Sequence, residues 1–359
     1  MDPLIKKNDY LDDVVIEEQK EDLFTVELSE RALVQTSNDR PKKVLFVSSG
    51  NLKNFDLAPF IKVQGDSLAE VGIQVTYFKI KGKGFLGYIR NIRNLRRIIK
   101  QYDFDLIHAH FTLSAWVAVL TFPKTPLVLS LMGTDALGRI KNSWKIPLVS
   151  NYLTTLTYLI QPFVTTIISK SPNIDKYVWL KKKSYILPNG VDFIKFDGKR
   201  TDFKRELGLS YNKKHILFLG STQDTNKNFK LLQSCKDELQ LKGFEIIAPY
   251  PVNHEKIVKY LSSVDQLVMC SLQEGSPNVV KEAMASNCKG VFTNVGDVQK
   301  LVNNTPGYAI TENNKDDLIK KILMVDKMST CEGRKKLQSL GLDTKSVANK
   351  LKNIYIKSL

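Results

Sequence analysis

The chain has few cysteines and lacks the motifs that define several large protein classes. Its four cysteines show no paired spacing of the metal-binding type, so we expect free thiols in a reducing cytosol. Residues 1–10 are charged and lack an apolar core, and they are not expected to act as a signal peptide. No Gly-x-Gly-x-x-Gly follows either predicted first strand, which argues against an NAD-dependent enzyme. No known nucleic-acid-binding motif is present, so nucleic acid is not an expected partner.

Acidic residues are also scarce outside the first 40 positions. Those positions hold 11 acidic and 5 basic side chains, whereas the remainder holds 26 acidic and 48 basic side chains. The part of the chain after residue 40 is therefore more basic than the net charge of +16 for the whole chain suggests. We expect this part to bind an anionic partner. A length of 359 residues suggests two domains rather than one.

One long stretch, residues 146–169, carries no charge and would be long enough to span a membrane. It also contains Asn151, Gln161, Pro162 and five threonines, a mixture that spanning helices rarely tolerate. We therefore predict a buried helix that ends near Gln161, followed by a strand over residues 164–169.

Apolar runs of strand length alternate with helical patterns, which predicts βαβ units and parallel sheets with helices on both faces. Strands are predicted at residues 43–48, 74–80, 105–110, 127–131 and 164–169, and the pattern then restarts with strands at 215–220, 244–248, 266–270 and 290–294. The resulting division is an acidic N-terminal extension (1–41, with a short helix near 10–23), a Rossmann-like domain (42–187), a linker (188–213), a second Rossmann-like domain (214–343) and a C-terminal helix (344–359).

The most informative stretch is Glu-Gly-Ser-Pro-Asn-Val-Val-Lys-Glu-Ala-Met-Ala, residues 274–285. Ser276 is a good N-cap residue and Pro277 suits the first helical position, so Glu274 is expected in a loop and Glu282 on a helix. The helix N-terminus between them would attract phosphate through its free N–H groups and its dipole. Two carboxylates beside an anion site suit a nucleotide sugar.

This string resembles the E-x7-E signature of retaining glycosyltransferases of the GT-B fold, family 4, and the resemblance extends over residues 42–357. It implies two Rossmann-like domains that face a central cleft, with a terminal helix that crosses back onto the first domain. In that family the first glutamate faces the donor sugar and the second binds the ribose, which assigns these roles to Glu274 and Glu282. The backbone N–H groups of Asn278 and Val279, beside Ser276 and Pro277, would bind donor oxygens.

The second domain would hold the donor, and its first strand ends at Gly220 and Ser221. Lys227 lies where a helix begins, so it is a candidate for the diphosphate. The family usually places an arginine six residues before this lysine, where Ser221 stands here, so one expected cation is missing. Lys230 or backbone amides would bind the diphosphate in place of the missing arginine.

The first domain would supply the acceptor side. Residues 107–111 resemble the family's His-x-His stretch, whose second histidine, His110, would face the donor sugar. His108 is predicted to point to the opposite face of its strand and to be structural. Thr134 and Asp135 match a family stretch His-Gly-Ser-Asp, in which methionine replaces the histidine, and they are candidate acceptor contacts. Gly50 matches the family's first-domain glycine loop near the donor phosphates.

The resemblance implies a metal-independent hexosyltransferase without a resident cofactor, in which Lys227 and the helix dipole stabilise the leaving diphosphate. Residues 103–105, Asp-Phe-Asp, resemble a metal motif of another glycosyltransferase fold, but they precede a buried strand at its amino end and are predicted to form a turn. UDP-sugar is the favoured donor, and GDP-sugar stays open.

A basic segment, residues 79–100, interleaves eight cations with apolar residues at helical spacing. It predicts docking on an anionic inner-leaflet membrane, where the acceptor would be a glycan or polyprenyl-linked sugar for capsule, O-antigen or exopolysaccharide synthesis. The protein would then be cytoplasmic and peripheral on the inner face of the cell membrane. The alternatives are another GT-B enzyme, such as a sugar epimerase or phosphorylase, and a basic polyanion-binding protein.

Overall fold

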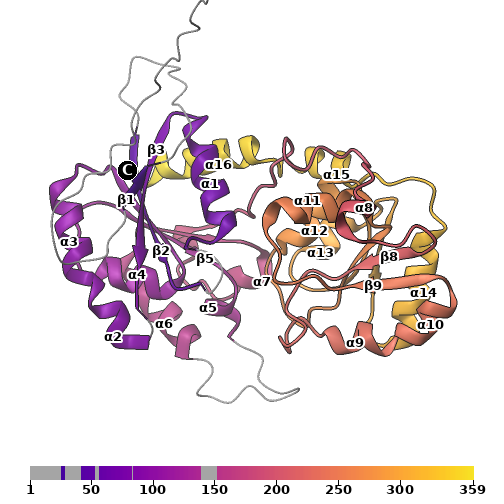
Figure 1. Cartoon of the computed structure of the whole chain (residues 1–359). Helices are drawn as coiled ribbons and strands as arrows, with labels where there is room; N and C mark the ends of the chain where they lie inside the picture. Colours follow the sequence, from indigo (N-terminus) through magenta and orange to yellow (C-terminus); the bar gives the residue numbers. More distant parts are fainter. Residues whose placement is uncertain (1–25, 29–41, 53–55, 83, 139–151) are drawn as a thin grey trace, which may run out of the picture.

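The computed structural model describes residues 26–28, 42–52, 56–82, 84–138 and 152–359. Two α/β units stand side by side, and the terminal helix α16 (Thr344–Ser358) lies against the first of them (Figure 1). This arrangement confirms the predicted α/β fold of two Rossmann-like units. The helix predicted near residues 10–23 falls outside the described residues.

The first sheet has seven strands in the order β1-β3-β2-β4-β5-β6-β7. Their bounds are β1 (Val26–Leu28), β2 (Lys42–Ser49), β3 (Ile73–Ile80), β4 (Leu106–His110), β5 (Leu127–Leu131), β6 (Thr166–Ser169) and β7 (Ser184–Ile186). All neighbouring pairs are parallel except β1 with β3. Because β1 belongs to residues 1–41, the predicted extension does not lie wholly outside the fold. Its three residues pair with β3. Without them, the edge of β3 would offer free backbone groups to a neighbouring chain.

Helices cover both faces of this sheet. They are α1 (Pro59–Ala69), α2 (Gly84–Ile89), α3 (Asn91–Gln101), α4 (Thr112–Val119), α5 (Thr134–Leu137), α6 (Tyr152–Ile160) and α7 (Pro172–Asp175). Successive residues of β2 point to opposite faces: Val44 and Phe46 join the core under α1 and α16, while Leu45 and Val47 join the core under α3 and α4. The sheet is therefore buried on both sides, as parallel sheets are.

The uncharged stretch 146–169 folds as predicted where it is described. The helix α6 ends at Ile160, one 3₁₀ turn covers Gln161–Phe163, and β6 follows. Residues 146–151 fall outside the described residues. No helix among those that the structure describes is both long and apolar enough to cross a bilayer.

The second sheet is wholly parallel, with the order β12-β11-β10-β8-β9. Its strands are β8 (Lys214–Leu217), β9 (Phe244–Ile247), β10 (Gln266–Met269), β11 (Lys289–Thr293) and β12 (Tyr308–Thr311). Its helices are α8 (Lys204–Leu207), α9 (Phe229–Ser234), α10 (Lys236–Leu241), α11 (His254–Ser263), α12 (Asn278–Ala285), α13 (Val298–Val302), α14 (Lys315–Asp326) and α15 (Gly333–Ser339). Between β8 and β9 the chain forms two helices, α9 and α10, which meet at the fully buried Cys235.

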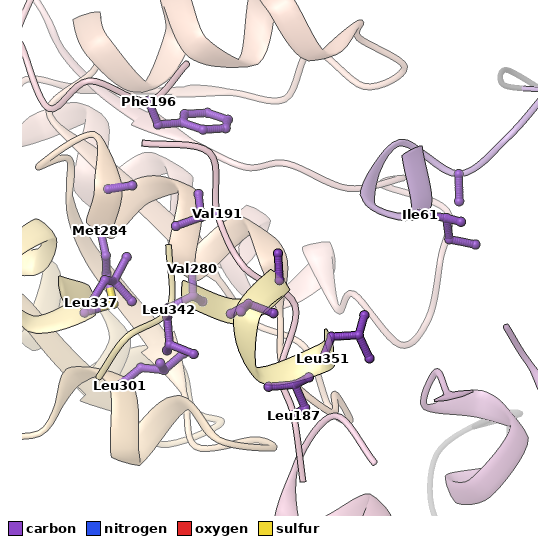
Figure 2. Packing of buried hydrophobic residues seen from close by; sticks show 14 of the residues in the cluster. Ile61, Leu187, Val191, Phe196, Val280, Met284, Leu301, Leu337, Leu342 and Leu351 are labelled. Carbon is purple, nitrogen blue, oxygen red and sulfur yellow. The ribbon is translucent and has the colours of Figure 1, made fainter. Parts of the chain in front are cut away.

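The two units are joined where the linker meets the start of α16. The N–H of Val191 donates to the Leu342 carbonyl at 2.9 Å, and the two residues lie together in the core shown in Figure 2. A Cβ on Gly190 would lie 2.9 Å from the Thr344 Cα, so only glycine fits this crossing. The same core includes Met284 of α12, so the helix that carries the motif packs directly against the crossing point.

Candidate active site

The two glutamates of the motif flank the N-terminus of α12, which follows β10. Glu274 lies in the loop and Glu282 on the helix, as predicted, and both are partly buried. The cap differs from the prediction, because Pro277 occupies the N-cap position and no side chain caps the helix. The Ser276 hydroxyl is instead engaged by the Lys281 ammonium, at 3.1 Å from the Nζ atom to the Oγ atom. The helix therefore keeps its first N–H groups free for a ligand.

Glu274 forms an ion pair with Lys227, with 2.6 Å between Oε1 and Nζ. Both side chains are partly shielded, with relative exposures of 31% for the lysine and 18% for the glutamate. The loops that carry them are joined by the Asn226 side chain, whose amide donates to the Gln273 carbonyl at 2.9 Å. Two residues that are 47 positions apart in the chain are thus held together, which the motif alone does not reveal.

Gly220 and Ser221 follow β8 and lie beside this pair. A Cβ on Gly220 would come within 3.3 Å of the Lys227 Cγ, so a side chain at this position would crowd the lysine. Ser221 is half-buried and brings no cation. Lys230, the suggested substitute for the missing arginine, is exposed.

Glu282 has a partner that the sequence analysis missed. The Nε2 atom of His254 lies 3.1 Å from the Glu282 Oε1 atom. The His254 ring packs edge-on against the Phe196 ring, with their centroids 5.4 Å apart. His254 opens α11, where the Asn253 side chain caps the helix. The sequence signal that could have revealed His254 is this cap, which lies in the loop after β9. Ligand-binding groups gather at the carboxyl edge of a parallel sheet, where such loops lie.

His108 and His110 lie on the same face of β4, and the prediction of opposite faces is wrong. Side chains alternate along a strand, so positions two apart share a face, and the two ring centroids are 4.2 Å apart. His108 makes two buried hydrogen bonds, with Nδ1 at 2.5 Å from the Tyr355 hydroxyl and Nε2 at 2.7 Å from the Ser130 hydroxyl. These bonds tie β4 to β5 and to α16, which gives His108 a structural role.

His110 is buried, and neither of its ring nitrogens has a hydrogen-bond partner among the described residues. Burial and the nearby Lys170 ammonium lower its pKa well below the usual value, so the ring is neutral at pH 7. The next residue, Phe111, has a φ of 84°, a left-handed conformation that bulky residues rarely adopt. Strain of this kind gathers at functional sites.

Thr134 and Asp135 open α5 and have different surroundings. Thr134 is exposed, whereas Asp135 is fully buried. The Asp135 carboxylate accepts from the N–H groups of Met132 and Gly133 at 2.9 Å each, and from that of Thr112 at 3.2 Å. Burial raises its pKa, although these three bonds oppose the shift. Asp135 therefore holds the loop that presents Thr134.

Gly50 follows β2 at the edge that faces the second unit. Its N–H donates to the Ile80 carbonyl at 2.9 Å, and a Cβ there would lie 3.0 Å from the Lys79 Cβ. The side-chain amide of the neighbouring Asn51 donates from its nitrogen to the Gly82 carbonyl and accepts from the Gly82 N–H with its oxygen, at 2.8 Å each. The glycine loop is therefore short and fixed by Asn51.

Two buried lysines that the sequence analysis did not single out lie between the units. Lys281 bonds to the Asn189 carbonyl at 2.8 Å and to Ser276, and burial lowers its pKa to about 8. Lys170 follows β6, is 3% exposed, and its Nζ atom has no hydrogen-bond partner among the described residues. Burial, together with repulsion from Lys281, lowers the Lys170 pKa to about 7.

The predicted turn at residues 103–105 is confirmed, since it precedes β4, and the Asp105 carboxylate accepts from the Lys43 N–H at 2.8 Å. Within the described parts of the chain, no group of three histidine, cysteine or acidic side chains is arranged to hold a metal ion. A hollow of about 600 Å³ lies at the carboxyl ends of β11 and β12, lined by Thr311, Glu312 and Lys321 among others, and none of the predicted site residues lines it.

Comparison with known families assigns one match to each unit. The model described as Glycosyltransferase Family 4 matches residues 54–194, and the one described as Glycosyl transferases group 1 matches residues 205–325. The chain belongs to glycosyltransferase family 4. Among curated proteins, the putative teichuronic acid biosynthesis glycosyltransferase TuaC of Bacillus subtilis is 25% identical over 237 residues. The match spans 57% of this chain and 57% of the length of TuaC.

Solved structures agree with this membership at the level of the fold. A sucrose-phosphate synthase from Thermosynechococcus elongatus superposes with a TM-score of 0.68 at 14% identity, covering 88% of this chain and 98% of its own. HepE of Anabaena, solved with UDP, superposes with a TM-score of 0.62 at 15% identity, covering 88% of this chain and 100% of its own. The predicted GT-B fold is therefore confirmed over almost the whole described chain of this family 4 member.

Proposed function

We propose that this chain transfers a sugar, with retention of configuration and without a metal, from a UDP-sugar to a lipid-linked glycan during surface-polysaccharide synthesis. The observation that carries the proposal is the placement of Lys227, Glu274 and Glu282 around the free N-terminus of α12. Structures of HepE with UDP and with UDP-glucose support a uridine donor over a guanosine donor. TuaC, named for teichuronic acid biosynthesis, and WaaB, a lipopolysaccharide outer core galactosyltransferase, support a surface glycan as the product.

The nucleotide would bind along the carboxyl edge of the second sheet. Glu282 would accept hydrogen bonds from the ribose hydroxyls, since a carboxylate is acceptor-only, and His254 would hold it in place. The N–H groups of Asn278 and Val279 would donate to the diphosphate at the positive end of the α12 dipole. Lys227 would supply the full positive charge.

The diphosphate would compete with Glu274 for Lys227. In the free protein these side chains form the 2.6 Å ion pair, and an arriving diphosphate would draw the ammonium toward itself. Glu274 would then be free to accept hydrogen bonds from sugar hydroxyls. As the bond from the anomeric carbon to the diphosphate breaks, the charge that develops on the diphosphate is stabilised by Lys227 and α12. The acceptor oxygen forms its new bond to the anomeric carbon, and the departing diphosphate accepts the proton of the acceptor hydroxyl.

The first unit would complete the reaction site. The neutral ring of His110 would face the donor sugar, and Gly50 would allow the backbone to approach the phosphates. Thr134, which is exposed at the start of α5, would contact the acceptor, while Asp135 would position that loop. These roles follow from family 4 membership and from the placement of each side chain at the carboxyl edge of the first sheet.

A membrane-bound acceptor is supported by exposed apolar side chains on three helices of the first unit. The apolar set consists of Phe85, Leu86, Leu120, Phe122, Leu159 and Phe163. It lies on α2, at the end of α4 and around the end of α6, and α4 packs against both other helices (Figure 1). Phe85 is 79% exposed and Phe122 is 77% exposed. Such exposure in bulky apolar residues is typical of an interaction surface.

The basic charge beside this set lies on α3. Arg90, Arg93, Arg96, Arg97 and Lys100 are all exposed. Lys79 and Lys81, which the sequence analysis counted with them, both bind Asp56 instead. Lys83 falls outside the described residues. The combination of an apolar set with an arginine row suits anionic lipid headgroups.

The proposal is tested by thermal unfolding against UDP, GDP, ADP, CMP and NAD without added metal, since a ligand that binds only the folded protein must raise the melting temperature. We expect a selective rise with UDP that Glu282→Ala removes. Lys227→Ala should impair diphosphate binding and turnover, and Glu274→Ala should reduce turnover more than UDP affinity. Full transferase activity in all three variants would overturn the site assignment, and no shift with any nucleotide would overturn the function.

A further inference from the structure

Lys170 is a buried cation whose ammonium has no partner. Its side chain is 3% exposed, and no hydrogen bond to its Nζ atom exists within the described residues. Lysine is almost never fully buried unless it is paired, because an isolated charge loses its hydration without compensation. The proposed nucleotide site assigns no role to the Lys170 side chain.

The surroundings of Lys170 do not supply a counter-ion. The charged groups that act on it are Lys281 of α12, which repels it, and Asp135 of α5, which attracts it, while His110 is neutral. The Asp135 carboxylate already accepts three backbone N–H groups. The Lys281 ammonium already donates hydrogen bonds to the Asn189 carbonyl and the Ser276 hydroxyl. Lys170 is therefore the cation in this cluster that is left for an anionic ligand.

Lys170 also lies next to the loop that carries Glu274. Three residues further along the chain, the Asn173 amide donates to the Glu274 carbonyl at 2.8 Å. A Cβ on Gly275 would lie 2.4 Å from the Ile174 Cδ1 atom, so the two units touch closely here. The unpaired ammonium thus belongs to the segment of the first unit that contacts the Glu274 loop, and it lies close enough to His110 to act on that ring.

We propose that Lys170 receives the carboxylate of the transferred sugar, so that the donor is a nucleotide-linked hexuronic acid. This inference rests on the proposed function and deepens it. The diphosphate is already assigned to Lys227 and α12 in the second unit, whereas Lys170 belongs to the first. A phosphate of a lipid carrier would stay near the membrane-facing surface, whereas a carboxylate on the transferred sugar would come to the side of Glu274 and His110, where Lys170 lies. It would convert the unpaired cation into a charge-assisted hydrogen-bonded pair.

The test is titration calorimetry with UDP, UDP-glucose and UDP-glucuronate, without acceptor, on three forms of the full chain. The forms are the wild type, Lys170→Met, and Lys176→Met as a control that removes a nearby exposed lysine. We expect the wild type to bind UDP-glucuronate about ten- to a hundredfold more tightly than UDP-glucose, the range for a buried charged hydrogen bond. Lys170→Met should abolish this preference and leave UDP affinity unchanged, and the control should keep both.

Three results would overturn the inference. The first is UDP-glucose binding as tightly as UDP-glucuronate to the wild type. The second is a loss of UDP affinity in Lys170→Met as large as the loss for UDP-glucuronate, which would assign the lysine to the diphosphate. The third is unchanged donor affinity in Lys170→Met with a raised KM for the acceptor, which would assign it to an acceptor anion. Failure of UDP itself to bind the wild type would overturn the proposed function instead.

Discussion

Replacing Lys170 by methionine should stabilise the ligand-free protein, the reverse of what substitutions in a buried site usually do. Methionine keeps the length and apolar body of the side chain and removes only the ammonium. Because that ammonium has no hydrogen-bond partner among the described residues, its removal breaks no bond and relieves a desolvation cost.

The magnitude follows from the Lys170 pKa. Burial lowers it from the ordinary 10.5 to about 7. Each tenfold change in proton affinity is worth about 1.4 kcal/mol, so at pH 7 the cost to folding is about 4 kcal/mol. This figure is an upper bound on the gain, because the surroundings of a charged side chain relax. We expect the variant to be more stable by about 2–4 kcal/mol at pH 7.

The sign of the pH dependence is set by the direction of the shift. A lysine with a lowered folded pKa binds more protons in the unfolded state between about 7 and 10.5, so wild-type stability gains from rising pH in this window. The variant lacks this gain. The advantage of Lys170→Met should therefore be largest at pH 7 and below, and should shrink toward zero near pH 10. Lys281, with its pKa of about 8, titrates in both proteins, but because it repels Lys170 its contribution does not cancel completely from the difference.

Urea unfolding of both proteins at pH 7 and at pH 9.5, followed by fluorescence, measures this difference directly. Lys281→Met is the matched contrast, since this buried lysine bonds to Asn189 and Ser276 and its loss should destabilise. If Lys170→Met is less stable than the wild type at pH 7, or if its advantage does not change with pH, the reasoning is refuted.

Three further predictions follow from other contacts. Tyr355→Phe should destabilise the protein by about 1–3 kcal/mol in urea unfolding, because it leaves a buried nitrogen of His108 unpaired; an unchanged midpoint would contradict the structural role of that histidine. Phe85→Ser with Leu86→Ser should reduce co-sedimentation with anionic vesicles and leave UDP binding intact, and equal sedimentation of both proteins would count against membrane docking. Gly275→Ala should lower turnover in a folded protein that still binds UDP, and full turnover would show that the contact is unimportant.

The fold could be predicted because its signals are local. In strands of five to eight residues and helices of ten or more, apolar residues recur with a period that can be recognised in a single sequence. The structure adds three strands that the pattern did not reveal, β1, β7 and β12, which are three or four residues long. Length alone does not explain the omission, because the predicted strands β6, β8, β9 and β10 are also only four residues long. The three missed strands share a position at an edge of their sheet.

The candidate site was predictable only where its residues are contiguous. Glu274 and Glu282 come from one string, and their loop and helix placement follows from that string. The partner of Glu282 is His254, which is 28 positions away, and nothing in the local sequence links them. Lys170 and Lys281 resemble ordinary surface lysines in the sequence, and only the packing of the two units buries them. Their importance is a tertiary effect that spacing cannot encode.

The contact between the units explains why the carboxylate spacing alone does not make the site. The Glu274 carbonyl is held by Asn173 of the first unit, and the loop is also closed from the second unit, where a Cβ on Gly296 would lie 1.8 Å from the Gly275 carbonyl oxygen. A side chain on Gly296 would have to move the loop, whereas one on Gly275 would displace the Ile174 side chain. Because the Lys227 ion pair is only 2.6 Å long, a small shift of that loop would break it. The position of the first glutamate is therefore set by two glycines and by the apposition of the two domains.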